Sequence, residues 1–193
     1  MNVTVIGNGN IGGTIGRALA AAGHSIFFGV REPDRATAEE SIPDALAASD
    51  VVVVAIPGAA VDSFVSGNAA ALAGKLVVDA TNRVGNPVLN SAATYRDEAP
   101  GSRYARAFNS LGWECLADPV FGDERADMFF AAPAADRATV EELVGAVGLR
   151  PVYVGEDPEV ADCAGRLWLT LVFGQKRGRN LALRVIERDA PTN

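Results

Sequence analysis

The sequence predicts an α/β protein built on a doubly wound, mostly parallel sheet, with a small helical portion at the C-terminal end. Three features of the chain lead to this prediction. Short apolar runs of strand length recur, Ala-rich stretches lie between several of them, and from Pro158 onward apolar residues recur at spacings of three and four. Strands that alternate with helices are typical of βαβ units, in which helices connect parallel strands.

The predicted strands are seven apolar runs. The run at residues 51–56 is apolar at every position, as expected for a parallel strand that is covered on both faces. A half-exposed antiparallel strand would alternate instead. The seven runs are Val3–Ile6, Ile26–Phe28, Val51–Ile56, Leu76–Val78, Tyr104–Phe108, Met128–Ala131 and Val152–Val154.

A glycine-rich turn follows the first predicted strand and precedes a helical pattern. Gly7, Gly9 and Gly12 have the Gly-x-Gly-x-x-Gly spacing of the Rossmann dinucleotide-binding turn. Gly7 would make the tight turn, Gly9 would let the backbone approach a pyrophosphate, and Gly12 with Gly16 would let the helix lie close to the sheet. The phosphates would lie at the helix N-terminus, where free N–H groups and the helix dipole favour anions. The predicted contacts are Gly7, Asn8, Gly9, Asn10, Ile11 and Gly12; the alternative is a Gly-rich turn in an ordinary α/β protein.

The end of the second predicted strand indicates which dinucleotide binds. NAD-binding proteins commonly carry an acidic residue here, which binds the ribose 2′-hydroxyl. This chain has Val30 and Arg31 instead, with Arg35 shortly after. A guanidinium suits a phosphate, so we predict NADP, with Val30, Arg31 and Arg35 around the 2′-phosphate. Glu32 and Asp34 weaken this prediction, and the alternative is that Arg31 is a solvated loop residue.

Polar residues follow three further predicted strands. Thr81 and Asn82 follow the fourth strand and Asn109 the fifth, while Ile56 and Pro57 close the third. In open α/β sheets, ligands bind outside the carboxyl ends of the strands. We therefore expect Ile56 and Pro57 along the cofactor and Thr81, Asn82 and Asn109 near the nicotinamide or its ribose. Each polar residue could equally be a helix cap or a turn residue.

The chain offers few residues for acid–base catalysis. His24 precedes the second strand, Lys75 precedes the fourth, and Lys176 lies in a basic C-terminal segment, so none of them is expected at the carboxyl ends of the strands. Dehydrogenases acting on alcohols ordinarily need a positioned proton donor or acceptor. Tyr95, Tyr104 and Tyr153 remain formal candidates. Flavins and deazaflavins need less help, because their conjugated rings accept a hydride directly. We therefore predict no acid–base catalytic residue and no metal.

Composition restricts the class of protein. The chain has 193 residues and a net charge of −7, which disfavours a general nucleic-acid binder, since such proteins neutralise phosphates with basic surface. Cys115 and Cys163 form neither a disulfide framework nor a metal motif. No apolar stretch reaches the roughly 18 residues of a membrane span, and no signal sequence precedes the first strand. We therefore expect a soluble, cytoplasmic protein with small-molecule partners.

The C-terminal region predicts a helical appendage. Apolar residues from Val160 to Val172 recur at helical spacing, and the segment 181–188 resumes that spacing after a basic interruption at 174–180. We predict a nucleotide-binding domain at residues 1–156 and an appendage at 157–193 that packs on the sheet edge or on a second subunit. The subunit contact, and hence a homodimer, is favoured because so small an appendage can hardly bury an apolar helix alone.

Six segments together resemble the F420-dependent NADP oxidoreductase family, whose members pass hydride between NADPH and the deazaflavin coenzyme F420. They are VTVIGNGNIG, Gly29-x-Arg31, VVVVAIPGAAV, VVDATN, AFNSLGWECLADPVFGDERADMFFAA and GLRPVYVG. The resemblance implies a Rossmann domain that holds NADP, with Arg31 on the 2′-phosphate and Asn109 beside the nicotinamide, and a C-terminal portion that shapes the deazaflavin pocket and a dimer interface. Val30 stands where the family often has Ser, which implies a softer preference for NADP over NAD.

The acceptor is less well defined than the cofactor. A deazaflavin carries a phosphate and a glutamate tail, for which Lys176, Arg177, Arg179 and Arg83 are the candidate cations; the alternative is a solvated basic loop. A flavin or other acceptor, and a non-catalytic NADP-binding module that senses redox state, remain alternatives. Larger Rossmann dehydrogenases with a long helical second domain are disfavoured, because only about 35 residues follow the last predicted strand, too few for a separate core.

Overall fold

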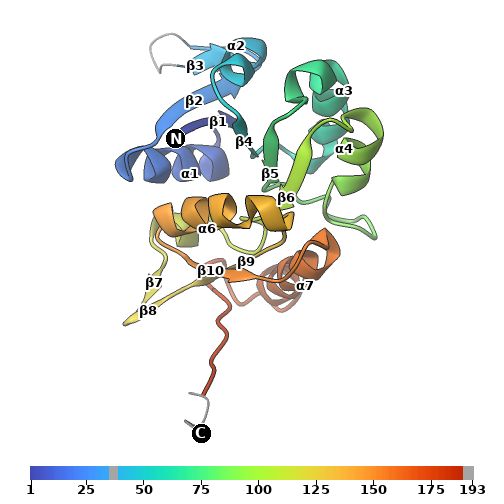
Figure 1. Ribbon diagram of the computed structural model, residues 1–193. Coiled ribbons are helices and arrows are strands. Elements are labelled where there is room, and N and C mark those ends of the chain that lie inside the picture. Colours follow the sequence, from blue (N-terminus) through green and yellow to red (C-terminus); the bar gives the residue numbers. More distant parts are fainter. Residues whose placement is uncertain (35–38, 189–193) are drawn as a thin grey trace, which may run out of the picture.

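The computed structural model describes residues 1–34 and 39–188. Its centre is a six-stranded parallel sheet with the order β3-β2-β1-β4-β5-β6, and Figure 1 shows helices on both of its faces. This is the predicted doubly wound α/β architecture, with the strand order of a Rossmann fold. The strands are β1 (Asn2–Ile6), β2 (Ser25–Val30), β3 (Glu39–Ser41), β4 (Val51–Val54), β5 (Leu76–Asp79) and β6 (Arg103–Arg106).

Two apolar clusters explain why the central strands are apolar on both faces. Val53 of β4 packs into one cluster, and its neighbours Val52 and Val54 pack into the other. The first cluster includes residues of α1 (Asn10–Ala21), α5 (Trp113–Ala117) and α6 (Arg137–Ala146). The second includes residues of α2 (Ile42–Ala47), α3 (Val61–Leu72) and α4 (Ala92–Glu98). Successive side chains of a strand point to opposite faces, so every position of such a strand is buried.

The last two predicted strands lie outside the central sheet. β9 (Asp127–Phe130) and β10 (Arg150–Tyr153) form a parallel pair, and β9 is linked to β6 only by an isolated bridge between Arg106 and Ala131. All seven predicted strands are therefore present. Three short strands were not predicted: β3 and the hairpin of β7 (Val120–Phe121) and β8 (Glu124–Arg125). They are two or three residues long and carry no apolar run of strand length.

Helix α7 (Pro158–Leu169) confirms the predicted C-terminal helix. Asp157, which precedes the helix, caps its first turn: the Asp157 carboxylate accepts from the Glu159 N–H at 2.9 Å. A π-helical turn, Thr170–Gly174, follows the last residue of the helix. Its buried residues Ala161, Asp162, Gly165 and Trp168 face the rest of the chain, beside β6 and β9 (Figure 1).

The prediction that residues 181–188 resume a helix is wrong. This segment is irregular and lies beside β9 instead, with the Asp127 N–H donating to the Leu183 carbonyl at 3.1 Å. The buried Asp127 carboxylate accepts from the Val185 N–H at 2.7 Å and from the Arg150 guanidinium at 2.6 and 2.7 Å. These contacts hold the segment extended, and the spacing of its apolar residues gave no sign of them.

Candidate dinucleotide-binding site

The glycines of the first turn have the geometry that the sequence predicts. Gly7 has φ +95°, and a Cβ there would lie 2.7 Å from the Ala55 carbonyl oxygen. A Cβ at Gly12 would collide with the carbonyl oxygen of Gly7, and one at Gly16 would collide with the Phe28 ring of β2. Gly9, by contrast, has nothing within 4 Å of its missing Cβ. The fold therefore needs Gly7 and Gly12, whereas Gly9 leaves open space at the helix N-terminus.

The turn opens onto a cavity of about 650 Å³ at the carboxyl ends of β1, β2 and β4. Gly7 and Gly9 form one wall, Val30 and Arg31 another, and Ile56 with Pro57 a third. Arg31 is exposed at the mouth. This is the crevice between the first and fourth strands, where the sheet order reverses and open α/β sheets bind ligands.

A second cavity of about 340 Å³ continues from the first toward β5 and β6. The two share Gly9, Ala55, Ile56 and Pro57, so they form two compartments on either side of the glycine-rich turn. Such a shape suits a dinucleotide whose pyrophosphate lies on the turn. The second compartment is lined otherwise by Asn10, Ile11, Gly58, Ala80, Thr81, Asn82, Phe108 and Leu111.

Three of the predicted cofactor contacts within the described residues do not line either compartment. The Asn8 side chain donates to the Glu39 carboxylate at 2.8 Å, and Gly12 serves the packing of α1 on the turn. Asn109 is 1% exposed and lies directly behind Asn82, whose amide N–H donates to the Asn109 carbonyl at 2.9 Å. Arg35 lies outside the described residues. The remaining ten predicted contacts lie along the two compartments.

Helices α2 and α3 contribute lining residues that the sequence analysis missed. They include Ile42, Ser63, Phe64 and Asn68, and Glu32 lies beside Arg31. These helices follow β3 and β4 and turn part of one face toward the first compartment. Their pattern of apolar residues predicts a helix but does not distinguish the face that packs on the sheet from the edge that reaches the cavity.

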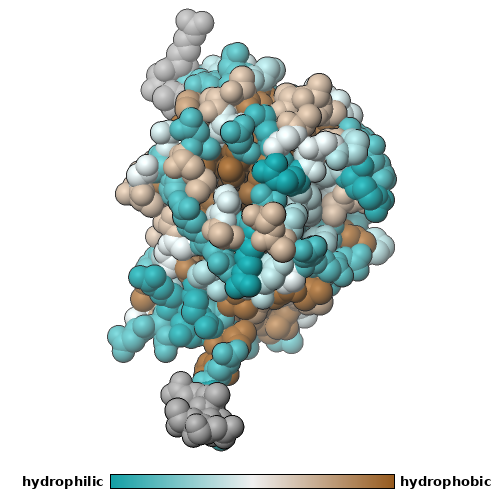
Figure 2. Space-filling view, viewed as in Figure 1, coloured by the Kyte–Doolittle hydropathy of each residue, from teal (hydrophilic) through white to brown (hydrophobic). Residues whose placement is uncertain are grey.

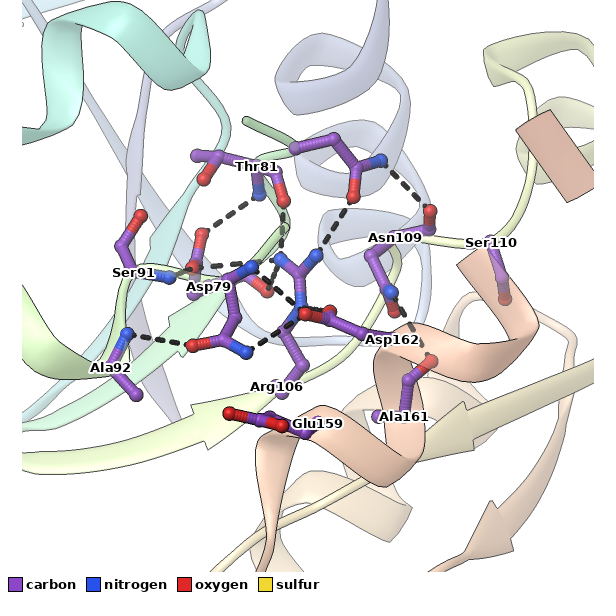
Figure 3. A network of polar contacts seen from close by, with 12 residues as sticks. Asp79, Thr81, Ser91, Ala92, Arg106, Asn109, Ser110, Glu159, Ala161 and Asp162 are labelled. Carbon is purple, nitrogen blue, oxygen red and sulfur yellow. Dashed lines mark hydrogen bonds and ion pairs between the residues drawn. The ribbon is translucent and has the colours of Figure 1, made fainter. Parts of the chain in front are cut away.

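A buried polar network lies behind the second compartment (Figure 3). At its centre Arg106 of β6 is fully buried, and its Nε donates to Asp162 of α7 at 2.9 Å. Its Nη1 lies 3.5 Å from a carboxylate oxygen of Asp79 and donates to the Thr81 carbonyl. Its Nη2 donates to the Asn82 side-chain oxygen at 2.8 Å. A buried charge is tolerated only when it is paired and hydrogen-bonded, and all three nitrogens of Arg106 meet that condition.

The backbone is strained where β6 ends. Phe108 has φ +60°, which is unusual for a bulky side chain and persists only where surrounding contacts impose it. Its N–H contacts the Met128 sulfur at 3.0 Å, and its side chain lines the second compartment. The turn at Phe108 directs the next residue, Asn109, back toward Asn82.

The candidate acid–base residues lie away from both compartments. His24 contacts the N-terminal amine at 3.2 Å, and Lys75 donates to the Ser49 carbonyl at 2.6 Å. Burial is the main cause that raises the pKa of Tyr95 and of Tyr104 well above the usual value. The Tyr153 hydroxyl donates to the Ala132 carbonyl at 3.1 Å. Among the described residues no group of acidic, His or Cys side chains could hold a metal ion.

The candidate cations for an acceptor differ in what they contact. Arg83 donates to Asp62, to Ser91 at 3.0 Å and to Thr94 at 2.9 Å, so its guanidinium is engaged within the protein. Arg179 pairs with Glu114 at 2.9 Å, with its side chain 43% exposed. The Arg179 carbonyl would lie 3.3 Å from a Cβ at Gly112, next to Leu111 of the second compartment. The basic segment at 176–179 thus approaches the second compartment.

Comparison with known proteins agrees with this geometry. Residues 2–83 match the family described as NADP oxidoreductase, coenzyme F420-dependent. The match confirms the family resemblance over this segment. The matched segment contains the glycine-rich turn, Arg31 and Thr81–Asn82, and the family match supports the predicted class, an NADP-dependent oxidoreductase.

Solved structures share the fold beyond the matched segment. A candidate F420-dependent NADP-reductase from Arthrobacter sp. FB24 has a TM-score of 0.80 at 22% identity, with 97% of this chain and 100% of that chain covered. A hypothetical protein from Sinorhizobium meliloti has a TM-score of 0.66 at 26% identity, over 81% of this chain and 85% of that one. A reductive aminase from Aspergillus terreus in complex with NADPH has a TM-score of 0.69 at 20% identity and covers 91% of this chain, but only 62% of the aminase is matched.

No helix within the described residues is long and apolar enough to cross a membrane.

Proposed function

We propose that the protein transfers a hydride between NADP(H) and a deazaflavin such as coenzyme F420. The observation that carries this proposal is the two-compartment cavity, in which one end presents a guanidinium and the other presents only apolar and neutral polar side chains. The first end suits a 2′-phosphate, and the second suits two stacked rings.

The cofactor would lie across the glycine-rich turn. Its pyrophosphate would contact the backbone of residues 7–12. Its 2′-phosphate would contact Arg31, beside Val30, with Arg35 as a second candidate. Its nicotinamide would lie at the end of the cavity near Thr81, Asn82 and Asn109. Ile56 and Pro57, shared by both compartments, would lie along its middle. When NADPH is bound it supplies the hydride, and the chain's own residues orient the ring and exclude water from it.

The deazaflavin assignment has two supports. The family matched over residues 2–83 is described as F420-dependent, and the lining of the second compartment contains Asn10, Thr81 and Asn82 but no side chain that exchanges protons near neutral pH. A conjugated ring accepts a hydride without a protein proton donor at the reacting carbon. Lys176, Arg177 and Arg179 would meet the acceptor's phosphate and carboxylates, and Arg179→Ala should weaken deazaflavin binding while NADP binding persists.

One absorbance experiment tests the proposal. Purified protein is mixed with NADPH and, in separate reactions, with F420 or with FMN, and nicotinamide absorbance is followed. Oxidation of NADPH by F420 alone is the expected result. Oxidation by FMN would indicate a flavin reductase, and tight NADPH binding with no turnover would indicate a redox-sensing module.

We also propose that the protein is a cytoplasmic homodimer whose subunits meet at the outer face of α7. Val160, Leu167 and Phe173 are 45%, 49% and 58% exposed, and Figure 2 shows apolar residues gathered at the lower right, over this helix. Burial of such a face stabilises association. Leu167→Glu should halve the mass measured by light scattering, and an unchanged mass would place the contact elsewhere.

A further inference from the structure

We infer that helix α7 positions the groups that receive the nicotinamide, acting through Arg106 and Asn109. This inference rests on the proposed function, because it takes the compartment beside Thr81 and Asn82 as the nicotinamide end. Arg106, Asp162 and Gly165 are buried behind that compartment and do not line it. They are therefore positioning residues, not contacts of the cofactor.

The first step is the orientation of the Asn82 amide. Its oxygen accepts from Arg106 Nη2 at 2.8 Å, and its nitrogen donates to the Asn109 carbonyl at 2.9 Å. A flipped amide would place its NH₂ group against the guanidinium, so these two bonds fix the positions of the amide oxygen and the amide nitrogen. A side-chain amide has two acceptor positions and two N–H groups. One of each therefore stays available on Asn82, which lines the compartment.

The second step concerns the hydroxyl of Thr81. The residue is 2% exposed and lines the same compartment, and its Oγ1 has no hydrogen-bond partner within the described residues. Its backbone is held on both sides, since its N–H donates to Asp79 at 2.8 Å and its carbonyl accepts from Arg106. Buried polar atoms are normally paired, so a ligand group is the expected partner. A carboxamide, with one carbonyl and one NH₂, matches this hydroxyl together with the Asn82 amide.

The third step links these groups to α7. Asp162 accepts from Arg106 Nε at 2.9 Å and, through its second oxygen, from the Asn90 side chain at 2.8 Å. One turn further along, a Cβ at Gly165 would lie 2.8 Å from the Asn109 amide nitrogen and 3.3 Å from its carbonyl oxygen. That carbonyl is the acceptor for Asn82. The close approach of α7 at Gly165 therefore fixes the position of Asn109, and the Asn109 carbonyl fixes the orientation of the Asn82 amide.

Gly165→Ala tests this chain of contacts, with Gly145→Ala as the matched control. Gly145 is also helical, and a Cβ there would meet nothing within 4 Å. Calorimetry measures the affinity for NADP⁺ and for adenosine 2′,5′-bisphosphate, which has the phosphorylated adenosine but no nicotinamide. Gly165→Ala should weaken NADP⁺ binding by about tenfold, the equivalent of one misplaced hydrogen bond, and leave the bisphosphate affinity unchanged. Gly145→Ala should change neither affinity.

Two outcomes would overturn the inference. An equal loss of affinity for both ligands in Gly165→Ala would show a general effect on the fold. Unchanged affinity for both would show that α7 does not position the site. If the wild-type protein bound neither ligand, the proposed function itself would fail, which is a different result.

Arg106→Lys is the second variant. Lys keeps the charge but is a point donor and cannot replace a planar group that serves several acceptors at once, so the bond to Asn82 should be lost. The same selective loss of NADP⁺ affinity is expected, and kcat for hydride transfer should fall more than the affinity does. Circular dichroism and the melting temperature identify a variant that fails to fold, and in that case Gly165→Ala decides alone.

Discussion

The two compartments of the site are built in different ways. In the first compartment, the wall at the glycine-rich turn is formed by backbone, with Gly7 and Gly9 close together in the sequence. The end near β5 and β6 is backed by side chains from distant segments, above all Arg106 and Asp162, which are 56 residues apart. Changes in the first compartment should therefore act mainly on binding or on local packing, whereas removal of the buried charge behind the second compartment should act on the whole fold.

The largest expected effect is that of Arg106→Met. Removing one member of a buried ion pair leaves the other uncompensated, which costs about 3–5 kcal/mol, and here both Asp79 and Asp162 lose their partner. The free energy of unfolding from urea titration measures this loss. Arg96→Met, which breaks an exposed pair with Asp97, should change it far less, because solvent screens such a pair. Similar values for both variants would contradict the view that the second compartment depends on a buried network.

Gly12→Ala and Gly9→Ala should separate folding from binding within the turn. A Cβ at position 12 collides with the Gly7 carbonyl, and such overpacking typically costs about 1–3 kcal/mol. A Cβ at position 9 meets no protein atom and the backbone there has φ −78°, so the fold should tolerate it while the pyrophosphate loses its close approach. Thermal melting and NADPH titration measure the two effects. Normal NADPH binding by the Gly9→Ala variant would mean that the pyrophosphate does not lie on this turn.

Arg31→Ala should lower the affinity for NADPH and leave the affinity for NADH unchanged. A hydrogen bond to a charged group contributes about 1.5–3 kcal/mol, equivalent to roughly a ten- to hundredfold change in Kd. Fluorescence titration with both nucleotides measures the ratio of the two affinities. Arg137→Ala, which removes a cation paired with Glu141 on α6, is the control and should alter neither. An unchanged ratio of the two affinities in Arg31→Ala would mean that another residue binds the 2′-phosphate.

The same contrast explains how much the sequence could predict. The strands, the turn and Arg31 are local signals, because a β-branched run, a glycine spacing and the residue at a strand end lie within 30 residues of one another. The partners of Asn82 and Asn109 are not local, since Arg106 and α7 reach them only after the chain has folded. The prediction of a helix at 181–188 was wrong for the same reason: contacts with the buried Asp127 carboxylate hold this segment extended despite its helical spacing of apolar residues. The family resemblance gave Asn109 a place near the nicotinamide but not the contacts that hold it there.

The smallest expected effect is a pH dependence of stability at the Asp62–Arg83 ion pair. Hydrogen bonds from Arg83 and then from Thr94 are the largest causes that lower the pKa of Asp62 below its usual value. A lowered pKa in the folded state means that the stabilisation is present above the usual pKa of an aspartate and is lost as the pH falls through the lowered value. Because Asp62 is 57% exposed, its contribution should stay below about 1 kcal/mol. Asp62→Asn should therefore lose little stability at pH 7, and the loss should shrink as the pH falls below the usual pKa of an aspartate, when wild type and variant are compared by urea titration. A difference between the two proteins that grows as the pH falls would mean that Asp62 is not held in its charged form by Arg83.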